Sequence, residues 1–329
     1  MIAVVTGASA GIGRAIAREF ADHGWDVAVL ARDRARLETA AAEIRDRGVR
    51  ALPIVTDVAD FAAVEAAAIR VEQELGPIDV WVNNAMATVF APFSRITAAE
   101  FRRGTEVTYL GQVHGTMAAL AQMRPRNRGT IVNVGSALAY RAIPLQSVYC
   151  GAKYAVRGFT DALRAELLHE RCAVKLVMVH LPAVNTPQFD WALNKTGRRP
   201  QPMPPIYQPE LPARAIFFAA THPQRREIWV GMSTVMTIVA NKLAPGLLDR
   251  YLARNGYSGQ LTDEALPEHA PANLFETAPG DYAAHGRFDD AARERSWEML
   301  ASRHRGVMLA GLTGLAALAG FLACRRRKL

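Results

Sequence analysis

The stretch IAVVTGASAGIGRA (residues 2–15) joins a short apolar run to a glycine-rich turn and then to the start of a helical pattern. Its glycines stand at positions 7, 11 and 13, in the spacing TGxxxGxG. Glycine lets the backbone turn tightly and approach a pyrophosphate, and the N–H groups at a helix start bind the anion. A glycine loop between a first strand and a first helix therefore predicts a dinucleotide-binding site.

Apolar runs rich in β-branched residues recur along the chain and alternate with helical patterns. The strand-like runs are 2–7, 27–32, 50–57, 78–85, 129–136, 174–182 and 226–231, and the helical stretches are 11–23, 33–48, 60–75, 97–124 and 148–171. Continuous apolar runs are typical of strands buried on both faces. The alternation predicts a Rossmann-type α/β fold, a doubly wound parallel sheet of about seven strands with helices on both faces.

Changes in composition and hydrophobic pattern divide the chain into parts. Residues 1–231 are expected to form the dinucleotide-binding catalytic domain, and residues 232–300 a helical extension and linker, with a basic tail at 325–329. The proline-rich stretch 196–212 cannot form a regular helix or a central strand. It is expected to be a lid or a pocket wall at the carboxyl edge of the sheet, with an inert surface loop as the alternative.

Composition excludes several classes of function. The chain has 329 residues and a formal net charge of +8, but its basic residues are scattered and no nucleic-acid motif is visible, so we expect no nucleic-acid partner. Cys150, Cys172 and Cys324 match neither a disulfide framework nor a metal site, so no metal is expected. Cysteine usage of this kind is typical of a reducing compartment.

The stretch SVYCGAKYAV (147–156) places Tyr149 and Lys153 four residues apart in an apolar run. Positions i and i+4 share one helix face, so the ammonium is expected to lower the pKa of the phenol. A phenol tuned in this way can act as a general acid or base. The alternative is an accidental surface pair.

The end of the second strand bears on the choice of cofactor. An NAD site usually has a carboxylate there, whereas this chain has Ala31 followed by Arg32. A guanidinium binds a phosphate well, so NADP is expected rather than NAD. Arg14 and Arg36 either assist in binding the phosphate or lie on a solvated helix face. If Asp33 were the ribose ligand, the preference would reverse.

Four motifs together resemble the short-chain dehydrogenase/reductase superfamily: the glycine loop, NNA at 83–85, Ser136 and the YxxxK pair. The resemblance covers about residues 1–231. It implies that Tyr149 exchanges a proton with the substrate oxygen, that Lys153 lowers the pKa of Tyr149 and binds the nicotinamide ribose, and that Ser136 orients the substrate carbonyl. With the glycine loop and the arginines, the expected cofactor contacts are Thr6, Gly7, Ser9, Gly11, Ile12, Gly13, Arg14, Arg32, Asp57, Val58, Asn83, Ala85, Tyr149, Lys153, Pro182 and Thr186.

The chain departs from the family pattern at three positions. Met86 and Ala183 stand where the family usually has glycine, and the side chain of Met86 is expected to narrow the pocket. Thr108 replaces an asparagine that holds a water in the family's proton relay. We expect the Thr108 hydroxyl to take over this catalytic role with altered geometry.

The segment GVMLAGLTGLAALAGFLAC (306–324) has nineteen residues and no charge. As a helix it would span about 28 Å, close to the hydrocarbon thickness of a bilayer. It predicts a transmembrane anchor that leaves the catalytic domain in the cytoplasm, with a buried packing helix as the alternative. The family resemblance implies a homodimer or homotetramer.

These observations predict an NADP-dependent oxidoreductase that transfers hydride between nicotinamide and a ketone or secondary alcohol. The apolar anchor and pocket edge favour a lipophilic substrate. The alternative is a non-catalytic NADP-binding sensor or scaffold of the same fold. This alternative is supported by Thr108, which stands where the family has an asparagine.

Overall fold

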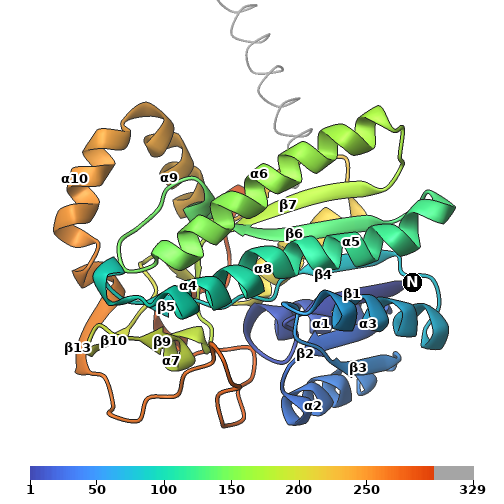
Figure 1. Ribbon diagram of the computed structural model, residues 1–329, viewed down its shortest axis with the longest axis horizontal. Coiled ribbons are helices and arrows are strands. Elements are labelled where there is room, and N and C mark those ends of the chain that lie inside the picture. The colour runs from blue at the N-terminus through green and yellow to red at the C-terminus, as the bar shows by residue number, and fades with distance from the viewer. Residues whose placement is uncertain (300–329) are drawn as a thin grey trace, which may run out of the picture.

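The computed structural model describes residues 1–299, and its centre is a parallel sheet of seven strands (Figure 1). The strands are β1 (Ile2–Thr6), β2 (Asp26–Ala31), β3 (Ala51–Val55), β4 (Val80–Asn83), β6 (Thr130–Ser136), β7 (Lys175–Leu181) and β12 (Glu227–Trp229). Their order across the sheet is β12-β7-β6-β4-β1-β2-β3. The predicted Rossmann-type doubly wound sheet is confirmed.

Helices cover both faces of the sheet. One face packs against α1 (Gly11–Asp22), α2 (Arg34–Arg45) and α8 (Glu210–Thr221), and the other against α3 (Phe61–Glu74), α5 (Gly111–Met123) and α6 (Ser147–His169), while α4 (Ala98–Thr105) packs against α6. Successive side chains of β1 alternate between these layers: Ala3 and Val5 join one buried cluster and Val4 the other. Because both faces are buried, the run is continuously apolar rather than alternating.

The helical stretch predicted over 97–124 is not one regular helix. A π-helical turn at Glu106–Leu110 separates α4 from α5. Such turns are frequent at functional sites, and this one carries Thr108.

The strand order reverses between β1 and β4, and ligands of this architecture bind at the carboxyl ends of strands at such a point. The connection after β7 lies over that edge. It contains β8 (Ala183–Val184), α7 (Gln188–Trp191), β9 (Leu193–Asn194), β10 (Arg198–Pro200) and β11 (Ile206–Tyr207), while β5 (Val89–Phe90) pairs with β9. The proline-rich stretch forms a wall at this edge, because Gln201, Pro202, Met203 and Pro204 line a cavity there.

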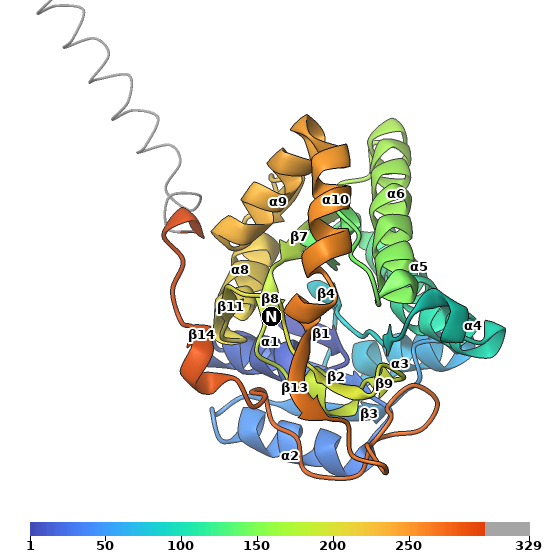
Figure 2. The same cartoon turned by 90° about the vertical axis from the view of Figure 1, so that its left-hand side faces the viewer.

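The chain after β12 folds back over the same edge. It forms α9 (Met232–Leu243), α10 (Pro245–Asn255) and β13 (Leu261–Ala265), then a long irregular segment, and β14 (Ala292–Arg293) beside β11 (Figure 2). Within residues 1–299, no helix combines the length and the apolar character that crossing a membrane requires. The predicted membrane span 306–324 lies outside the described residues.

Candidate active site

Ser136, Tyr149 and Lys153 line one cavity of about 380 Å³ at the carboxyl edge of the sheet. Ser136 is the last residue of β6, and the other two lie in the first turns of α6. The Lys153 Nζ atom is buried, donates a 2.6 Å hydrogen bond to the carbonyl of Val134, and lies 5.5 Å from the centre of the Tyr149 ring. The three residues expected to be catalytic are thus brought together.

Burial, rather than the charge of Lys153, sets the protonation of this pair. Burial raises the pKa of Tyr149 to about 12, and a hydrogen bond with Ser136 only partly opposes the rise. Burial also lowers the pKa of Lys153 to about 7. The expected lowering of the pKa of Tyr149 is therefore not found in this structure, because losing water disfavours both charged forms. Tyr149 is a neutral phenol at neutral pH, the form that donates a proton.

The Thr108 hydroxyl is hydrogen-bonded to the main chain in this structure. Thr108 is fully buried, and its Oγ1 accepts a 2.9 Å hydrogen bond from Ala87 N and donates a 2.8 Å bond to Ala87 O. Its single proton is committed to the peptide backbone. Thr108 therefore fastens the π-helical turn to the loop after β4, and its expected role in holding a relay water stays a prediction.

A buried polar network behind Ser136 was missed by the sequence analysis. The Nδ1 atom of His180, on β7, lies 3.1 Å from the Ser136 carbonyl oxygen, and its Nε2 lies 3.5 Å from the Glu227 carboxylate. Glu227 also accepts hydrogen bonds from the Tyr140 hydroxyl and from the Trp229 indole. The network ties β12 to the end of β6. In the sequence, this network is indicated by a single histidine within the apolar run VKLVMVHLP (174–182).

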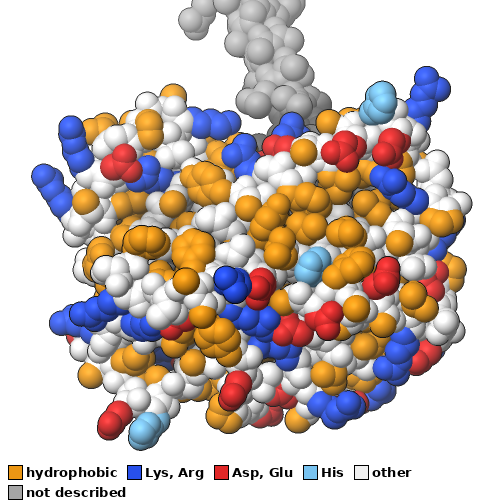
Figure 3. Space-filling view, in the orientation of Figure 1, with side chains coloured by type: hydrophobic (Ala, Val, Ile, Leu, Met, Phe, Trp, Pro, Cys, Tyr) orange, Lys and Arg blue, Asp and Glu red, His pale blue; other side chains and the backbone are white. Residues whose placement is uncertain are grey.

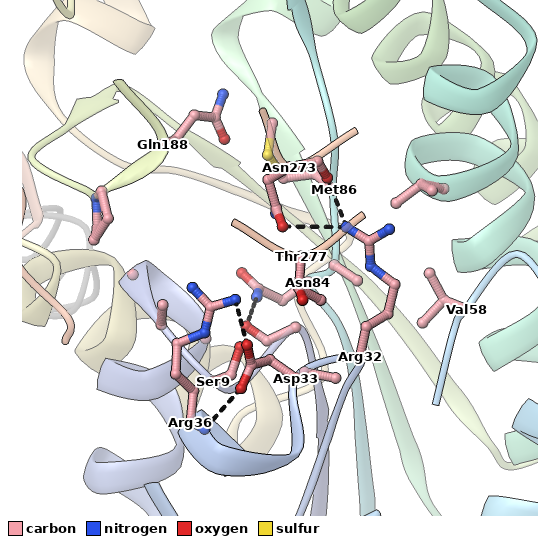
Figure 4. Close-up of a pocket in the computed structure, with 18 of the residues that line it drawn as sticks. Ser9, Arg32, Asp33, Arg36, Val58, Asn84, Met86, Gln188, Asn273 and Thr277 are labelled. Carbon is pink, nitrogen blue, oxygen red and sulfur yellow. Dashed lines mark hydrogen bonds and ion pairs between the residues drawn. The ribbon is translucent and has the colours of Figure 1, made fainter. Parts of the chain in front are cut away.

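A second cavity, of about 150 Å³, adjoins the first and contains the glycine loop (Figure 4). Both cavities are lined by Ile12, Asn84, Met86, Thr186 and Gln188, so they form one cleft. Gly7 and Gly11 have φ values of +67° and +58°, a backbone region that favours glycine. A Cβ atom at Gly13 would lie 2.1 Å from the Gly7 carbonyl oxygen. The spacing TGxxxGxG thus has a steric cause, and the absence of side chains at these positions suits close contact with a dinucleotide.

Most of the expected cofactor contacts line this cleft. Those around the glycine loop and the adjacent strand ends are Gly7, Ser9, Gly11, Ile12, Gly13, Arg32, Asp57, Val58, Ala85 and Thr186, and those in the catalytic cavity are Tyr149, Lys153 and Pro182. Arg103 forms an ion pair with Asp57 and helps to hold the pKa of that carboxyl below its usual range, against the opposing effect of burial.

Three expected contacts lie elsewhere. The Thr6 hydroxyl accepts hydrogen bonds from the N–H groups of Asn84 (2.9 Å) and Ala85 (3.1 Å), so it ties β1 to the loop after β4. Asn83 is fully buried and its Nδ2 donates a 2.9 Å bond to Asn133, so Asn84 rather than Asn83 faces the cleft. The Arg14 side chain is buried and pairs with Glu43, at 3.0 and 2.7 Å, and it is not among the residues that line the cleft.

Two arginines line the cleft near the end of β2: Arg32, which follows the strand, and Arg36, in the first turn of α2 (Figure 4). The Asp33 carboxylate caps α2 by accepting from Arg36 N at 2.9 Å, and it pairs with Arg36 Nη2 at 2.9 Å. Within residues 1–299, the buried Nε and Nη1 atoms of Arg36 have no hydrogen-bond partner. Arg32 instead binds main-chain oxygens of a distant segment, including Asn273 O at 2.6 Å and Phe275 O at 2.8 Å.

Asn273 and Thr277, which line the cleft from that distant segment, were also missed by the sequence analysis. They belong to a polar stretch that carries no motif, and no local signal could have placed them beside β2. The cleft is therefore completed by a segment that the sequence analysis assigned to a linker.

Comparison with known proteins gives a consistent result. Residues 1–195 match the family model described as short chain dehydrogenase. The uncharacterized oxidoreductase YxnA of Bacillus subtilis is 31% identical over 326 residues, 98% of this chain and 91% of YxnA. The 3-dehydrosphinganine reductase of Danio rerio is 32% identical over 191 residues, 56% of this chain and 57% of that protein.

A solved structure resembles the fold as well. The alcohol dehydrogenase from the archaeon Thermococcus sibiricus, complexed with 5-hydroxy-NADP, is 28% identical with a TM-score of 0.60, over 70% of this chain and 94% of that one. The fold, the cleft and these similarities agree, and the chain belongs to the short-chain dehydrogenase family, as an oxidoreductase of the dehydrogenase/reductase type.

Proposed function

We propose that this enzyme is an NADP-dependent oxidoreductase that transfers hydride between the nicotinamide and a ketone or secondary alcohol, and that its substrate is lipophilic. The proposal is carried by one observation: Ser136 and Tyr149 open into an apolar cavity that is continuous with the dinucleotide cleft.

Two features support NADP over NAD. The Asp33 carboxylate caps α2 and pairs with Arg36, so its negative charge toward a phosphate is offset by the guanidinium. The two unpartnered donors of Arg36 within the described residues fit a phosphate, because buried polar groups rarely lack an acceptor. The archaeal alcohol dehydrogenase binds an NADP analogue, which agrees with this preference.

The side chains of the catalytic cavity fit the reduction of a carbonyl. Bound nicotinamide would supply the hydride, and the chain must then stabilise and protonate the oxygen that gains charge. Tyr149, a phenol in this structure, donates the proton, and Ser136 donates a hydrogen bond to the same oxygen. Lys153 is held by Val134 O and lies beside the Tyr149 ring, where it orients the phenol and binds the cofactor ribose.

The lining of the catalytic cavity supports a lipophilic substrate. Its apolar walls come from the loops after β4 and β6, the connection after β7, and α10. These walls include Met86, Leu138, Ile143, Val184, Phe189, Pro202, Met203, Leu248 and Leu252. Burying such surface favours an apolar ligand by about 25 cal/mol per Å². Since one relative is a 3-dehydrosphinganine reductase, that compound is a sensible first substrate to test.

The proposal is tested with purified protein, NADPH and NADH in parallel, and a panel of long-chain and small ketones. We expect faster oxidation of NADPH than of NADH, and faster turnover of long-chain ketones than of small ones. Tyr154→Phe is the matched control for Tyr149→Phe, since Tyr154 lies on the same helix outside the cavity. Intact cofactor binding without turnover of any carbonyl would favour the sensor or scaffold.

We further propose that the protein assembles as a homodimer or homotetramer through α4, α5 and α6. Hydrophobic side chains gather over this face (Figure 3), and Phe101, Leu110, Met117 and Tyr154 are exposed on it. Exposed apolar patches of this kind mark interaction surfaces. Light scattering on the purified protein tests the proposal, and a monomer at micromolar concentration would contradict it.

The uncharged segment 306–324 supports a third proposal, that the protein is anchored in a membrane with its catalytic domain in the cytoplasm. Membrane fractionation tests it. The full chain should sediment with membranes, and Leu315→Arg should release it, because an arginine at the centre of a span costs about 2.5–3.5 kcal/mol on translocon scales. Recovery of both the full chain and Leu315→Arg in the soluble fraction would contradict the anchor.

A further inference from the structure

Residues 273–289, hereafter the strap, belong to the long irregular segment that follows β13 (Figure 2), and they contact the dinucleotide cleft at several points. The strap begins beside the ends of β2 and β3. There the Arg32 guanidinium donates to Asn273 O at 2.6 Å and to Phe275 O at 2.8 Å, and Arg103 Nε donates to Leu274 O at 3.2 Å. Both arginines belong to the part of the cleft around Asp57. Asn273 and Thr277 line the cleft itself (Figure 4).

The middle of the strap contacts the glycine loop directly. The carbonyl of Ala283 accepts a 2.9 Å hydrogen bond from the N–H of Gly11, and the carbonyl of Tyr282 accepts a 3.0 Å bond from Arg14. The Tyr282 ring packs edge-on against Trp191, with ring centres 4.5 Å apart. Main-chain N–H groups at a helix start are the groups that bind a pyrophosphate, so the strap carbonyl and an anion compete for the same donor.

The end of the strap is fixed beside the residues expected to contact the nicotinamide. Gly286 packs so closely on Thr186 that a Cβ atom there would lie 2.4 Å from the Thr186 carbonyl oxygen. The His285 imidazole lies 2.9 Å from Glu210 and 2.7 Å from Asp289. Asp289 in turn accepts a 2.9 Å bond from Asn185, the neighbour of Thr186.

We propose that the strap is a gate of the cofactor site: it closes over the bound dinucleotide and must detach for the dinucleotide to enter or leave. This inference rests on the proposed function only in requiring that a nicotinamide dinucleotide binds the cleft. A strap fixed at Arg32, Gly11 and Thr186 spans the length over which the dinucleotide extends. A charged phosphate is a stronger acceptor than a neutral carbonyl, so binding displaces Ala283 from Gly11 and leaves the two ends to hold the strap closed.

The experiment compares two pairs of matched variants. Gly286→Ala pushes the strap off Thr186, whereas Gly158→Ala adds a methyl group to α6 where nothing lies within 4 Å. His285→Gln removes the ion pairs at a site away from the cleft, and His269→Gln changes an exposed histidine that precedes the strap. The second pair keeps the test valid if Gly286→Ala disturbs Thr186 itself or fails to fold.

The readouts are the dissociation rate of NADPH, followed by stopped-flow fluorescence, and amide hydrogen exchange of residues 273–289. We expect saturating NADP to slow exchange across the strap, and Gly286→Ala and His285→Gln each to speed NADPH dissociation by about tenfold relative to their controls. Strap exchange that NADP leaves unchanged, or dissociation within about twofold of the controls for both variants, would overturn the gate. If NADPH does not bind the wild-type protein at all, the proposed function fails rather than the gate.

Discussion

The Lys153 ammonium lies 5.5 Å from the centre of the Tyr149 ring, yet the pKa of the phenol is raised to about 12 rather than lowered. Proximity of a cation favours the phenolate, but burial disfavours it more, and burial also lowers the pKa of Lys153 itself to about 7. The pair therefore presents a protonated acid to the substrate rather than a preformed base. A protonated phenol is the form that can donate a proton to a carbonyl oxygen.

Replacing Tyr149 with phenylalanine should lower the rate of carbonyl reduction by about 10²- to 10⁴-fold, the usual contribution of a general acid. NADPH affinity should change little, since only one hydroxyl is lost. Single-turnover oxidation of NADPH measures the first quantity and fluorescence titration the second. Tyr154→Phe should retain activity, and an equal loss in both variants would contradict the assignment.

The pKa of Tyr149 can be measured directly by the Cζ chemical shift of tyrosines labelled with ¹³C. A group whose pKa is raised to about 12 stays protonated throughout the neutral and mildly alkaline range. We therefore expect the Tyr149 signal, assigned with Tyr149→Phe, to remain unshifted up to about pH 10, near the ordinary tyrosine pKa. Alcohol oxidation, which needs the phenolate, should accelerate over the same interval. A titration near neutral pH would contradict the account.

Arg36 should determine the preference for NADPH. Its buried Nε and Nη1 atoms, unpartnered within the described residues, should each gain an acceptor when a 2′-phosphate binds. A hydrogen bond to a charged group contributes about 1.5–3 kcal/mol, so losing both in Arg36→Met should raise the Kd for NADPH by about 10²- to 10⁴-fold. The Kd for NADH should change far less. Equal weakening of both cofactors would show that Arg36 supports the fold and not the phosphate.

Gly115 should be needed for stability rather than for chemistry. A Cβ atom there would lie 2.0 Å from Asn83 Oδ1 and 2.7 Å from the Trp81 indole nitrogen. These groups are hydrogen-bonded to each other at 2.8 Å inside the core. Gly115→Ala should lower the free energy of unfolding by about 1–3 kcal/mol, as overpacking does, and urea denaturation measures the change. An unchanged midpoint would mean that the core relaxes around the methyl group.

The strap should loosen as the pH rises. Partial burial opposes the charge of His285, but hydrogen bonds to Glu210 and Asp289 raise its pKa above the ordinary value. The ion pairs are therefore present below about pH 6.5 and are lost as the pH rises through the raised pKa. The nearby cavity also holds other charged groups: Arg214, Glu294 and Arg295.

NADPH dissociation should consequently be slower at pH 6 than at pH 8.5, and His285→Gln should remove most of this difference. Stopped-flow measurements across the two pH values, with His269→Gln as the control, provide the check. A pH dependence that persists in His285→Gln would assign it to another group.

The sheet could be predicted from the sequence because its strands are buried on both faces, so Ala3, Val4 and Val5 are apolar without interruption. The candidate catalytic residues Ser136, Tyr149 and Lys153 could be identified because their motifs are local, and the structure places all three in one cavity. Other features were decided by geometry that local patterns do not encode. At the end of β4, the exact register determines that Asn83 enters the core and Asn84 faces the cleft.

Long-range contacts were the main feature that could not be predicted from the sequence. The contact between Arg32 and Asn273 joins residues 241 positions apart, and neither neighbourhood carries a sign of the other. The π-helical turn at Thr108 is likewise fixed by the peptide of Ala87 on another segment. Arg32 could be identified as a cleft residue from its position after the second strand. Its hydrogen-bond partners, Asn273 and Phe275, could not be predicted.

The transfer of deuterium tests the central claim most directly. The enzyme is incubated with NADPH deuterated at the nicotinamide C4 carbon and with 3-dehydrosphinganine or another long-chain ketone, and the alcohol product is examined by mass spectrometry. We predict one deuterium on the carbinol carbon with the wild-type protein and with Tyr154→Phe, and a strongly reduced yield with Tyr149→Phe. Tightly bound NADPH that transfers no deuterium to any ketone in the panel would contradict the account.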